Sequence, residues 1–280
     1  MKIYLMTDME ATAGILNHDD WVLPAGLHYA KGQRLLTGEI NAAVDGFFAG
    51  GATEVLVVDG HGAGGIDPEL LDERAKLQRG WADQVRPLSL DRSYAGIAWV
   101  GQHAKAGTPF SHITHSGWFD TIDMTVNGIS IGEYGEMALC AKELGVPCFF
   151  AAGEQAFCEE AQALTPGVVT VAVKWGLKND GPQLEALDMD SYRRAKLSAV
   201  HLAPAKARQV IREGAVQAMR KLCEQRAAFS FPELQPPFVK LHRFRARKHA
   251  NGETPAHRTR AEHPTSLIAL FNQPEQKLAD

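Results

Sequence analysis

The chain has 280 residues, of which 45% are hydrophobic and 22% are charged, and its formal net charge is −4. Such a chain can bury a large core, as one long domain or as one domain with a smaller companion, and its composition is that of an ordinary soluble protein. The negative charge argues against a nucleic-acid partner, and the lack of a long apolar run argues against a membrane span or a signal peptide, so we expect a cytoplasmic protein.

Strand and helix patterns alternate along the first part of the chain. Short, continuous apolar runs are typical of parallel strands that are covered on both faces. These runs are 2–7, 54–58, 96–101, 147–152 and 167–173. Apolar residues recur at helical spacing in 33–49 and 133–144. The alternation predicts an α/β fold, with a mostly parallel sheet flanked by helices and right-handed crossovers.

The C-terminal part has a different pattern. A helix is predicted at 204–224, a Pro-rich connection follows at 231–237, and an alternating, exposed strand begins at Val239. We therefore place a boundary near residue 200. It separates a metal-binding catalytic α/β domain, 1–200, from a smaller C-terminal α+β region, 201–280, with a role in oligomerisation or as a lid.

Two carboxylates, Asp8 and Glu10, follow the first predicted strand. Residues i and i+2 of a strand point to the same side, so both carboxylates can face one site while Met9 turns toward the core. Two neighbouring carboxylates repel each other unless a cation or a proton lies between them. The pair indicates a metal site, although a solvated turn or a helix cap gives the same short pattern.

Two histidines stand at the equivalent place after later strands. His61 lies in the glycine-rich run DGHGAGG, and His103 follows the next buried strand. Ligands of open α/β sheets bind outside the carboxyl ends of the strands, so we expect these imidazoles beside the two carboxylates. Asp59 is a second acid behind His61 or a turn former, and Lys105 contacts a substrate carboxylate or faces solvent.

A histidine-containing loop and the start of a helix supply the remaining candidates. His112 and His115 lie in 108–118, which can cover the site, and one of them is a candidate for proton transfer to the leaving group. The residues alone do not separate the two. Glu133 can complete a second metal, with Glu136 as the rival ligand, although acids are also favoured in any first helical turn.

Two further features have ordinary explanations. The stretch 240–260 carries seven Lys or Arg against one acid, together with His242, His249 and His257. We interpret it as a solvated edge strand and loop rather than as an anion site or a contact with another subunit. The four cysteines form no CxxC pair and are expected to be reduced, mostly buried thiols. They are Cys140, Cys148, Cys158 and Cys223.

Eight short motifs follow one another in a characteristic order. They are MTDME at 6–10 with Gly14 beyond it, EVLVVDGHG at 54–62, GQHAKAGTP at 101–109, THS at 114–116, GEYGEMAL at 132–139, AAGE at 151–154, AVK at 172–174 and LAPAKA at 202–207. In this order and spacing the motifs resemble those of the zinc D-aminopeptidases encoded with dipeptide-transport operons. The resemblance covers roughly the first three-quarters of the chain.

The resemblance implies an aminopeptidase that releases D-amino acids from the N-termini of short peptides. His115, which is followed by Ser116, matches the family's catalytic histidine, whereas His112 has no counterpart. Members of this family assemble into large toroidal oligomers, which implies a decamer-like ring of identical chains.

The resemblance also implies two Zn²⁺ ions per chain. By carry-over, the five ligands are Asp8, Glu10, His61, His103 and Glu133. Asp8 would bridge both ions. Glu10 and His103 would hold one ion, and His61 and Glu133 would hold the other.

Three features depart from the family's pattern. The loop between His103 and His115 is one residue longer, 175–195 resembles an insertion, and the basic tail from 240 onward has no match. Two other functions remain as alternatives. A metal-dependent amidase or phosphoesterase would use the same ligands on a non-peptide substrate, and a non-catalytic assembly protein would hold a structural metal. The peptidase is favoured over a structural zinc because no cysteine belongs to the candidate site.

Overall fold

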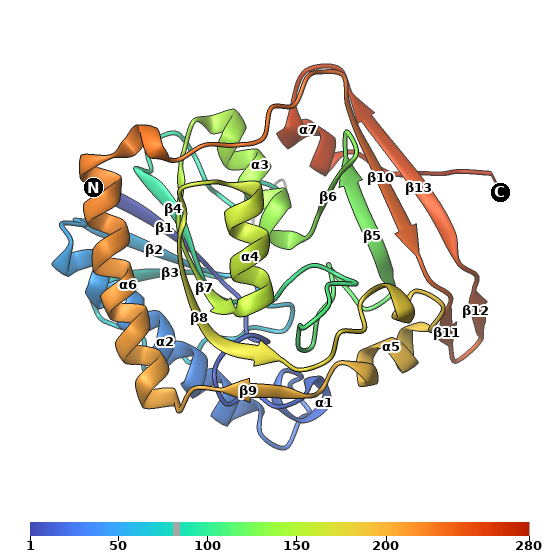
Figure 1. The fold of residues 1–280 in the computed structure, drawn as a ribbon, viewed down its shortest axis with the longest axis horizontal. Coiled ribbons are helices and arrows are strands. Elements are labelled where there is room, and N and C mark those ends of the chain that lie inside the picture. The colour runs from blue at the N-terminus through green and yellow to red at the C-terminus, as the bar shows by residue number, and fades with distance from the viewer. Residues whose placement is uncertain (81–84, 280) are drawn as a thin grey trace.

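A seven-stranded sheet forms the centre of the molecule in the computed structural model, which describes residues 1–80 and 85–279 (Figure 1). Its order is β3-β2-β1-β4-β7-β8-β9, and every neighbouring pair is parallel except β8 and β9. The strands are β1 (Lys2–Thr7), β2 (Glu54–Asp59), β3 (Ala75–Gln78), β4 (Gly96–Gln102), β7 (Cys148–Glu154), β8 (Val169–Gly176) and β9 (Ala199–His201). The predicted α/β fold with a mostly parallel sheet is confirmed.

Helices cover both faces of this sheet. The principal helices are α2 (Tyr29–Ala49), α3 (Glu133–Leu144), α4 (Gln155–Leu164) and α6 (Pro204–Glu224). Alternate residues of β1 show how the two cores are divided. Ile3 and Leu5 belong to the core beneath α2 and α6, whereas Tyr4 and Met6 belong to the core beneath α3 and α4. The central strands are therefore apolar on both faces, as the continuous runs predict.

A second, antiparallel sheet of five strands lies beside the first. Its order is β14-β13-β10-β5-β6. The strands are β5 (Thr121–Val126), β6 (Ile129–Ile131), β10 (Phe238–Phe244), β13 (His257–His263) and β14 (Gln276–Lys277). Strand β10 is paired on both sides, by β13 and by β5, so the prediction that it is an edge strand is wrong. The β5–β6 hairpin, which no apolar run marks in the sequence, supplies the second partner.

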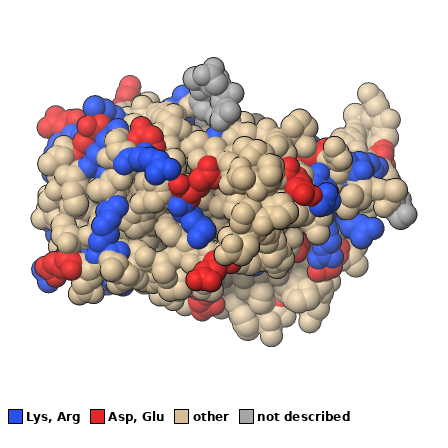
Figure 2. Space-filling view, turned by 90° about the horizontal axis from the view of Figure 1, so that it is seen from above, with Lys and Arg blue, Asp and Glu red and all other residues tan. Residues whose placement is uncertain are grey.

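The basic stretch 240–260 is largely neutralised by acids of the same chain. The ion pairs are Lys240–Glu275, Arg243–Glu185, Arg247–Asp120, Lys248–Asp188 and Arg260–Glu262. On the face in Figure 2, basic and acidic side chains are interspersed, including at the end of the molecule that carries β10 and β13. This arrangement does not favour an anion site in the stretch.

The smaller elements join these layers. They are α1 (His18–Trp21), α5 (Met189–Ala195), β11 (Arg247–His249), β12 (Gly252–Thr254), α7 (Leu267–Asn272) and two short 3₁₀ helices, Pro182–Leu184 and Arg226–Ala228. The predicted helices 133–144 and 204–224 have the bounds of α3 and α6, whereas α2 begins before the predicted 33–49. The four cysteines are free, and only Cys223 is exposed. None of the helices in the described ranges combines the length and the apolar composition needed to cross a bilayer.

The division of the chain near residue 200 stays a prediction. Contacts cross it, since α6 packs on α2 and β10 pairs with β5. The C-terminal hairpin of β10 and β13 nevertheless projects at the end of the molecule opposite to α6 (Figure 1).

Candidate metal centre

The register of the parallel sheet brings three strand ends together. Thr7, the last residue of β1, pairs with Asp59 of β2 and with Val100 of β4. The residues that follow these strands therefore emerge side by side at one edge. Gly101 makes the approach possible, because its φ is +78° and a Cβ at this position would lie 2.0 Å from the carbonyl oxygen of Asp8.

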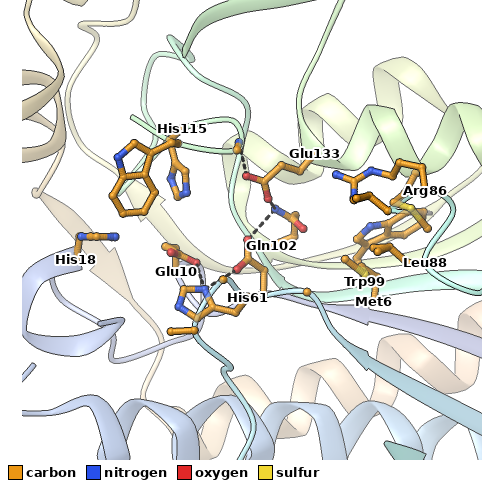
Figure 3. A pocket seen from close by; sticks show the side chains of 18 of the residues that line it. Met6, Glu10, His18, His61, Arg86, Leu88, Trp99, Gln102, His115 and Glu133 are labelled. Carbon is orange, nitrogen blue, oxygen red and sulfur yellow. Dashed lines mark hydrogen bonds and ion pairs between the residues drawn. The ribbon is translucent and has the colours of Figure 1, made fainter. Parts of the chain in front are cut away.

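The structure brings the five predicted ligands together, and Figure 3 shows Glu10, His61 and Glu133 among them. Nδ1 of His61 lies 3.1 Å from Oδ1 of Asp8 and 3.3 Å from Oε2 of Glu10. Nε2 of His103 lies 3.2 Å from Oδ2 of Asp8 and 3.7 Å from Oε2 of Glu133. Asp8 thus faces one imidazole with each carboxylate oxygen. Four of the five residues are buried, and Glu133 is partly exposed.

The nearest contacts divide the ligands differently from the pairing that the resemblance implies. Apart from Asp8, the carboxylate paired with His61 is that of Glu10, and the carboxylate paired with His103 is that of Glu133. The strand order explains this, because β1 lies between β2 and β4 and so places the two histidines on opposite sides of Asp8. Asp8, Glu10 and His103 still lie within 4.8 Å of one another, as the implied set for one ion requires.

Hydrogen bonds prepare both histidines as metal ligands. Nε2 of His61 lies 2.8 Å from the carbonyl oxygen of Val22, and Nδ1 of His103 lies 2.8 Å from that of Ala104. Each carbonyl oxygen accepts a hydrogen bond from one ring N–H, so the other ring nitrogen carries a lone pair and faces the carboxylates. In the part of the chain that the structure describes, the buried Nε2 of His103 has no hydrogen-bond partner. Such a nitrogen fits a metal ligand.

The electrostatics of the site also favour a bound cation. Burial alone would raise the pKa of Asp8 and Glu10, but the neighbouring imidazoles hold both values below the usual range. Burial would lower the pKa of His61 and His103, but the carboxylates raise both values. The acids therefore need a positive partner, and a divalent metal can supply it while both imidazoles stay neutral.

His115 lies against the ligands and has a free ring nitrogen. Its ring stacks on that of His103, with centroids 4.1 Å apart, and on Phe119. Nδ1 lies 2.9 Å from the carbonyl oxygen of Ile113, which leaves Nε2 available. Burial lowers the pKa of His115, and an imidazole in this position is suited to proton transfer.

The other candidate residues from the sequence lie away from the ligands. The imidazole of His112 is 3.4 Å from Nζ of Lys174, and burial followed by this charge lowers its pKa to about 2. Glu136 pairs with Arg86. Lys105 donates to Ser130 and does not line the cavity described below.

Asp59 is a turn former. Both of its carboxylate oxygens lie 3.0 Å from the backbone N–H of Gly65, which closes the loop that carries His61.

Two residues of the site were missed by the sequence analysis. The side-chain amide of Gln102 donates to Asp8 over 2.9 Å and to Glu133 over 3.1 Å, so it fixes two of the carboxylates. His18 is buried, and its ring centroid lies 6.5 Å from that of His115. The position of Gln102 at the end of β4 was a usable signal, whereas nothing near His18 in the sequence indicates the site.

Two buried charged residues hold the loops of the site from behind. Glu154, the last residue of β7, accepts hydrogen bonds from the backbone N–H groups of Ala104 and His112. Lys174 of β8 donates to the carbonyl oxygens of Glu10 and Ile15. Burial lowers the pKa of Lys174 to about 8. Strands β7 and β8 therefore fix the segments that follow β4 and β1 and carry candidate ligands.

A cavity of about 310 Å³ opens over the ligands. Its walls include Asp8, Glu10, His61, Glu133 and His115. Carboxylates, imidazoles and a cavity of this size can hold metal ions and admit a small substrate. This arrangement suits hydrolysis at a metal centre.

A family model described as D-aminopeptidase, peptidase family M55, matches residues 1–255. The chain belongs to the D-aminopeptidase family. The match includes 240–255, so the expectation that the tail from 240 onward lies outside the family's pattern is wrong for that segment.

Two known proteins are similar to the chain. A curated D-aminopeptidase of Bacillus subtilis (strain 168) is 35% identical over 179 residues, which are 62% of this chain and 64% of that relative. The similarity thus spans just under two thirds of the relative's length. A solved structure described as the Zn-dependent D-aminopeptidase DppA from Bacillus subtilis, a self-compartmentalizing protease, has a TM-score of 0.77 at 23% identity. The likeness covers 97% of this chain and 94% of that one, and it shows a common fold.

Proposed function

We propose that the protein is a two-zinc aminopeptidase that hydrolyses N-terminal amino acids, of D configuration, from short peptides. The observation that carries this proposal is the convergence of carboxylates and imidazoles from four segments on one cavity that also contains His115. Membership of the D-aminopeptidase family supports the reaction class, and the relative named as Zn-dependent supports the choice of metal.

The donor set fits two metal ions. Asp8 would help to hold both ions, because Oδ1 faces His61 and Oδ2 faces His103. Glu10 would complete the set with His61, and Glu133 the set with His103. Bound zinc would lower the pKa of a water molecule to about 7 and polarise the peptide carbonyl.

His115 would transfer the proton. Its neutral ring, oriented by the carbonyl of Ile113, can accept a proton from the attacking water and then donate it to the leaving amine. Gln102 would keep Asp8 and Glu133 in position during this transfer. The hydrophobic stacking of Phe119 on His115 limits the movement of the ring.

The test is hydrolysis of D-Ala-D-Ala and L-Ala-L-Ala by the purified protein, with its metal content measured before and after addition of zinc. Cleavage of the D-peptide alone, with about two zinc ions per chain, is the expected result. Zinc binding without cleavage of either peptide would overturn the peptidase, and a panel of other amides and phosphate esters would then identify the substrate class. Full turnover after removal of all metal would overturn the metal mechanism.

We also propose a cytoplasmic, ring-shaped homo-oligomer. The relative described as self-compartmentalizing supports assembly, and the projecting hairpin of β10 and β13 supports a role of 201–280 in contacts between subunits (Figure 1). Sedimentation velocity tests this, because a single species with the mass of one chain, 30.5 kDa, would contradict it.

A further inference from the structure

The cavity has two chemically different ends on either side of the ligands (Figure 3). One end is formed by rings: His115, His18 and Trp118, with the His18 and Trp118 centroids 5.4 Å apart. The opposite end is lined by Met6, Leu88, Trp99 and Met137. These four side chains are almost fully buried, and they belong to the core beneath α3 and α4. The second end is therefore an apolar pocket that opens from the ligands.

Among residues 1–80 and 85–279, the charged side chains beside the apolar end are paired. Arg86 is the cation on its wall, and its guanidinium is paired with Glu136 of α3. The pair is mostly buried and leaves neither charge free for a ligand. A charged side chain entering this end would lose its hydration without gaining a partner, which is strongly unfavourable.

Leu88 is held in this pocket by a strained backbone. Its φ is +55°, a backbone conformation that residues other than glycine rarely adopt. The carbonyl oxygen of Leu88 accepts a hydrogen bond of 2.7 Å from the hydroxyl of Tyr4, which is fully buried in β1. Strain of this kind persists only where the surroundings impose it, and it is concentrated at functional sites. Here it places a leucine side chain where it limits the apolar end.

We propose that the apolar end receives the side chain of the substrate's N-terminal residue, and that Leu88 sets its depth. This proposal rests on the proposed aminopeptidase function. His115 donates its proton to the leaving amine, so the departing peptide lies at the His115 end of the cavity. The residue on the other side of the scissile bond must then extend toward Met6 and Leu88. The enzyme accordingly selects apolar, uncharged N-terminal side chains.

The experiment measures kcat/KM of the zinc-loaded enzyme for dipeptides X-Ala, in whichever configuration it cleaves. X is Ala, Leu, Phe, Lys or Glu. The wild type is expected to prefer Leu over Lys and Glu. Leu88→Gly relieves the backbone strain and deepens the pocket, so it should raise the Phe-to-Ala ratio by about tenfold. Leu88→Phe should lower kcat/KM for Leu-Ala while Ala-Ala is retained.

Controls separate this inference from folding and from the function itself. Thermal unfolding checks each variant, and Met137→Ala, which enlarges the same end, replaces Leu88→Gly if the latter does not fold. Trp118→Leu, at the His115 end, should alter the preference for the second residue and leave the first unchanged. If both enlarged variants cleave dipeptides but keep the wild-type ratio of kcat/KM for Phe-Ala to kcat/KM for Ala-Ala, the assignment of the pocket is wrong. The proposed aminopeptidase function is then unaffected. No cleavage of any dipeptide by the wild type overturns the proposed function and the pocket together.

Discussion

His61 and His115 lie in the same cavity, but they contact different groups. His61 faces two carboxylates, whereas His115 stacks on His103 and keeps Nε2 free. We predict that His61→Ala lowers zinc affinity and activity together. His115→Gln should retain zinc and lower kcat by about 10²- to 10⁴-fold, the usual contribution of a proton-transfer group. Metal analysis after dialysis, combined with steady-state kinetics, distinguishes the two.

An exposed histidine provides the control for these variants. His249 lies in β11, outside the cavity, and His249→Ala should leave both zinc content and kcat unchanged. Loss of zinc in His115→Gln would show that this residue is a ligand. That result would contradict the role given to it.

Glu39 is a buried acid of α2 with incomplete hydrogen bonding. One oxygen accepts the N–H of Ala13 over 2.9 Å, and within the described residues Oε2 has no partner. Burial raises the pKa of Glu39 from 4.5 to about 8, although the bond from Ala13 and the charge of Lys174 oppose the shift. The folded chain therefore binds this proton more tightly than the unfolded chain.

This raised pKa predicts a stability that depends on pH. The contribution is complete below the unfolded pKa near 4.5 and is lost as the pH rises through about 8. Glu39→Gln keeps an acceptor for Ala13 and removes the charge, so near pH 8 it should raise the free energy of unfolding by on the order of 2 kcal/mol. Urea unfolding at about pH 5 and about pH 8 measures this effect. If the free energy of unfolding falls equally for the wild type and for Glu39→Gln between these two pH values, the prediction is contradicted. Glu69 is exposed, so Glu69→Gln is the control.

At the scale of elements, the end of β7 connects two loops of the site. Both oxygens of Glu154 accept backbone N–H groups, one from Ala104 beside His103 and one from His112 near His115. Glu154→Gln replaces one of these accepting oxygens by an NH₂ group, which would face a backbone N–H and cannot accept its hydrogen bond. We predict a loss of about 1–3 kcal/mol in the free energy of unfolding, because a buried N–H is left unpaired.

The same substitution should lower kcat more than it changes KM, since the loop of His115 is less well fixed. Exposed Glu159→Gln in α4 removes the same charge and should change neither quantity. Unchanged kcat in a destabilised Glu154→Gln would show that Glu154 has a purely structural role.

Elements were predicted best where the sequence pattern is local. Burial of β1, β2, β4 and β7 on both faces produces continuous apolar runs, and α3 and α6 show clear helical spacing. The hairpin of β5 and β6 was missed because β5 alternates polar and apolar residues instead of forming a continuous apolar run, and β6 has only 3 residues. The missed hairpin led directly to the wrong interpretation of β10 as an edge strand.

At the scale of the whole molecule, the candidate metal centre joins segments that are distant in sequence. The proposed ligands follow β1, β2 and β4 and begin α3. Zinc at a concentration of about 100 times its dissociation constant should stabilise the fold by about 2.7 kcal/mol, which raises Tm by on the order of 5 °C. Thermal unfolding with zinc and with a chelator measures the difference. The same Tm in both would contradict the centre, and His61→Ala should show a smaller response.

The sequence by itself predicted which side chains lie together at the candidate site. Parallel strands end in register, so a ligand that follows an apolar run can be assigned to one rim without knowledge of the rest of the fold. Asp8, Glu10, His61 and His103 were predicted in this way, and the structure brings them together with Glu133. Family membership, which the motif order indicated, is confirmed by the match over residues 1–255.

The tertiary structure alone decided which of these groups meet. The strand order β2-β1-β4 places His61 and His103 on opposite sides of Asp8, and no local pattern contains this order. Gln102, His18 and Leu88 reach the cavity only through packing between segments far apart in sequence. Sequence patterns report the faces of individual elements, whereas contacts between elements depend on topology and on the shape of the core, which form only when the whole chain folds.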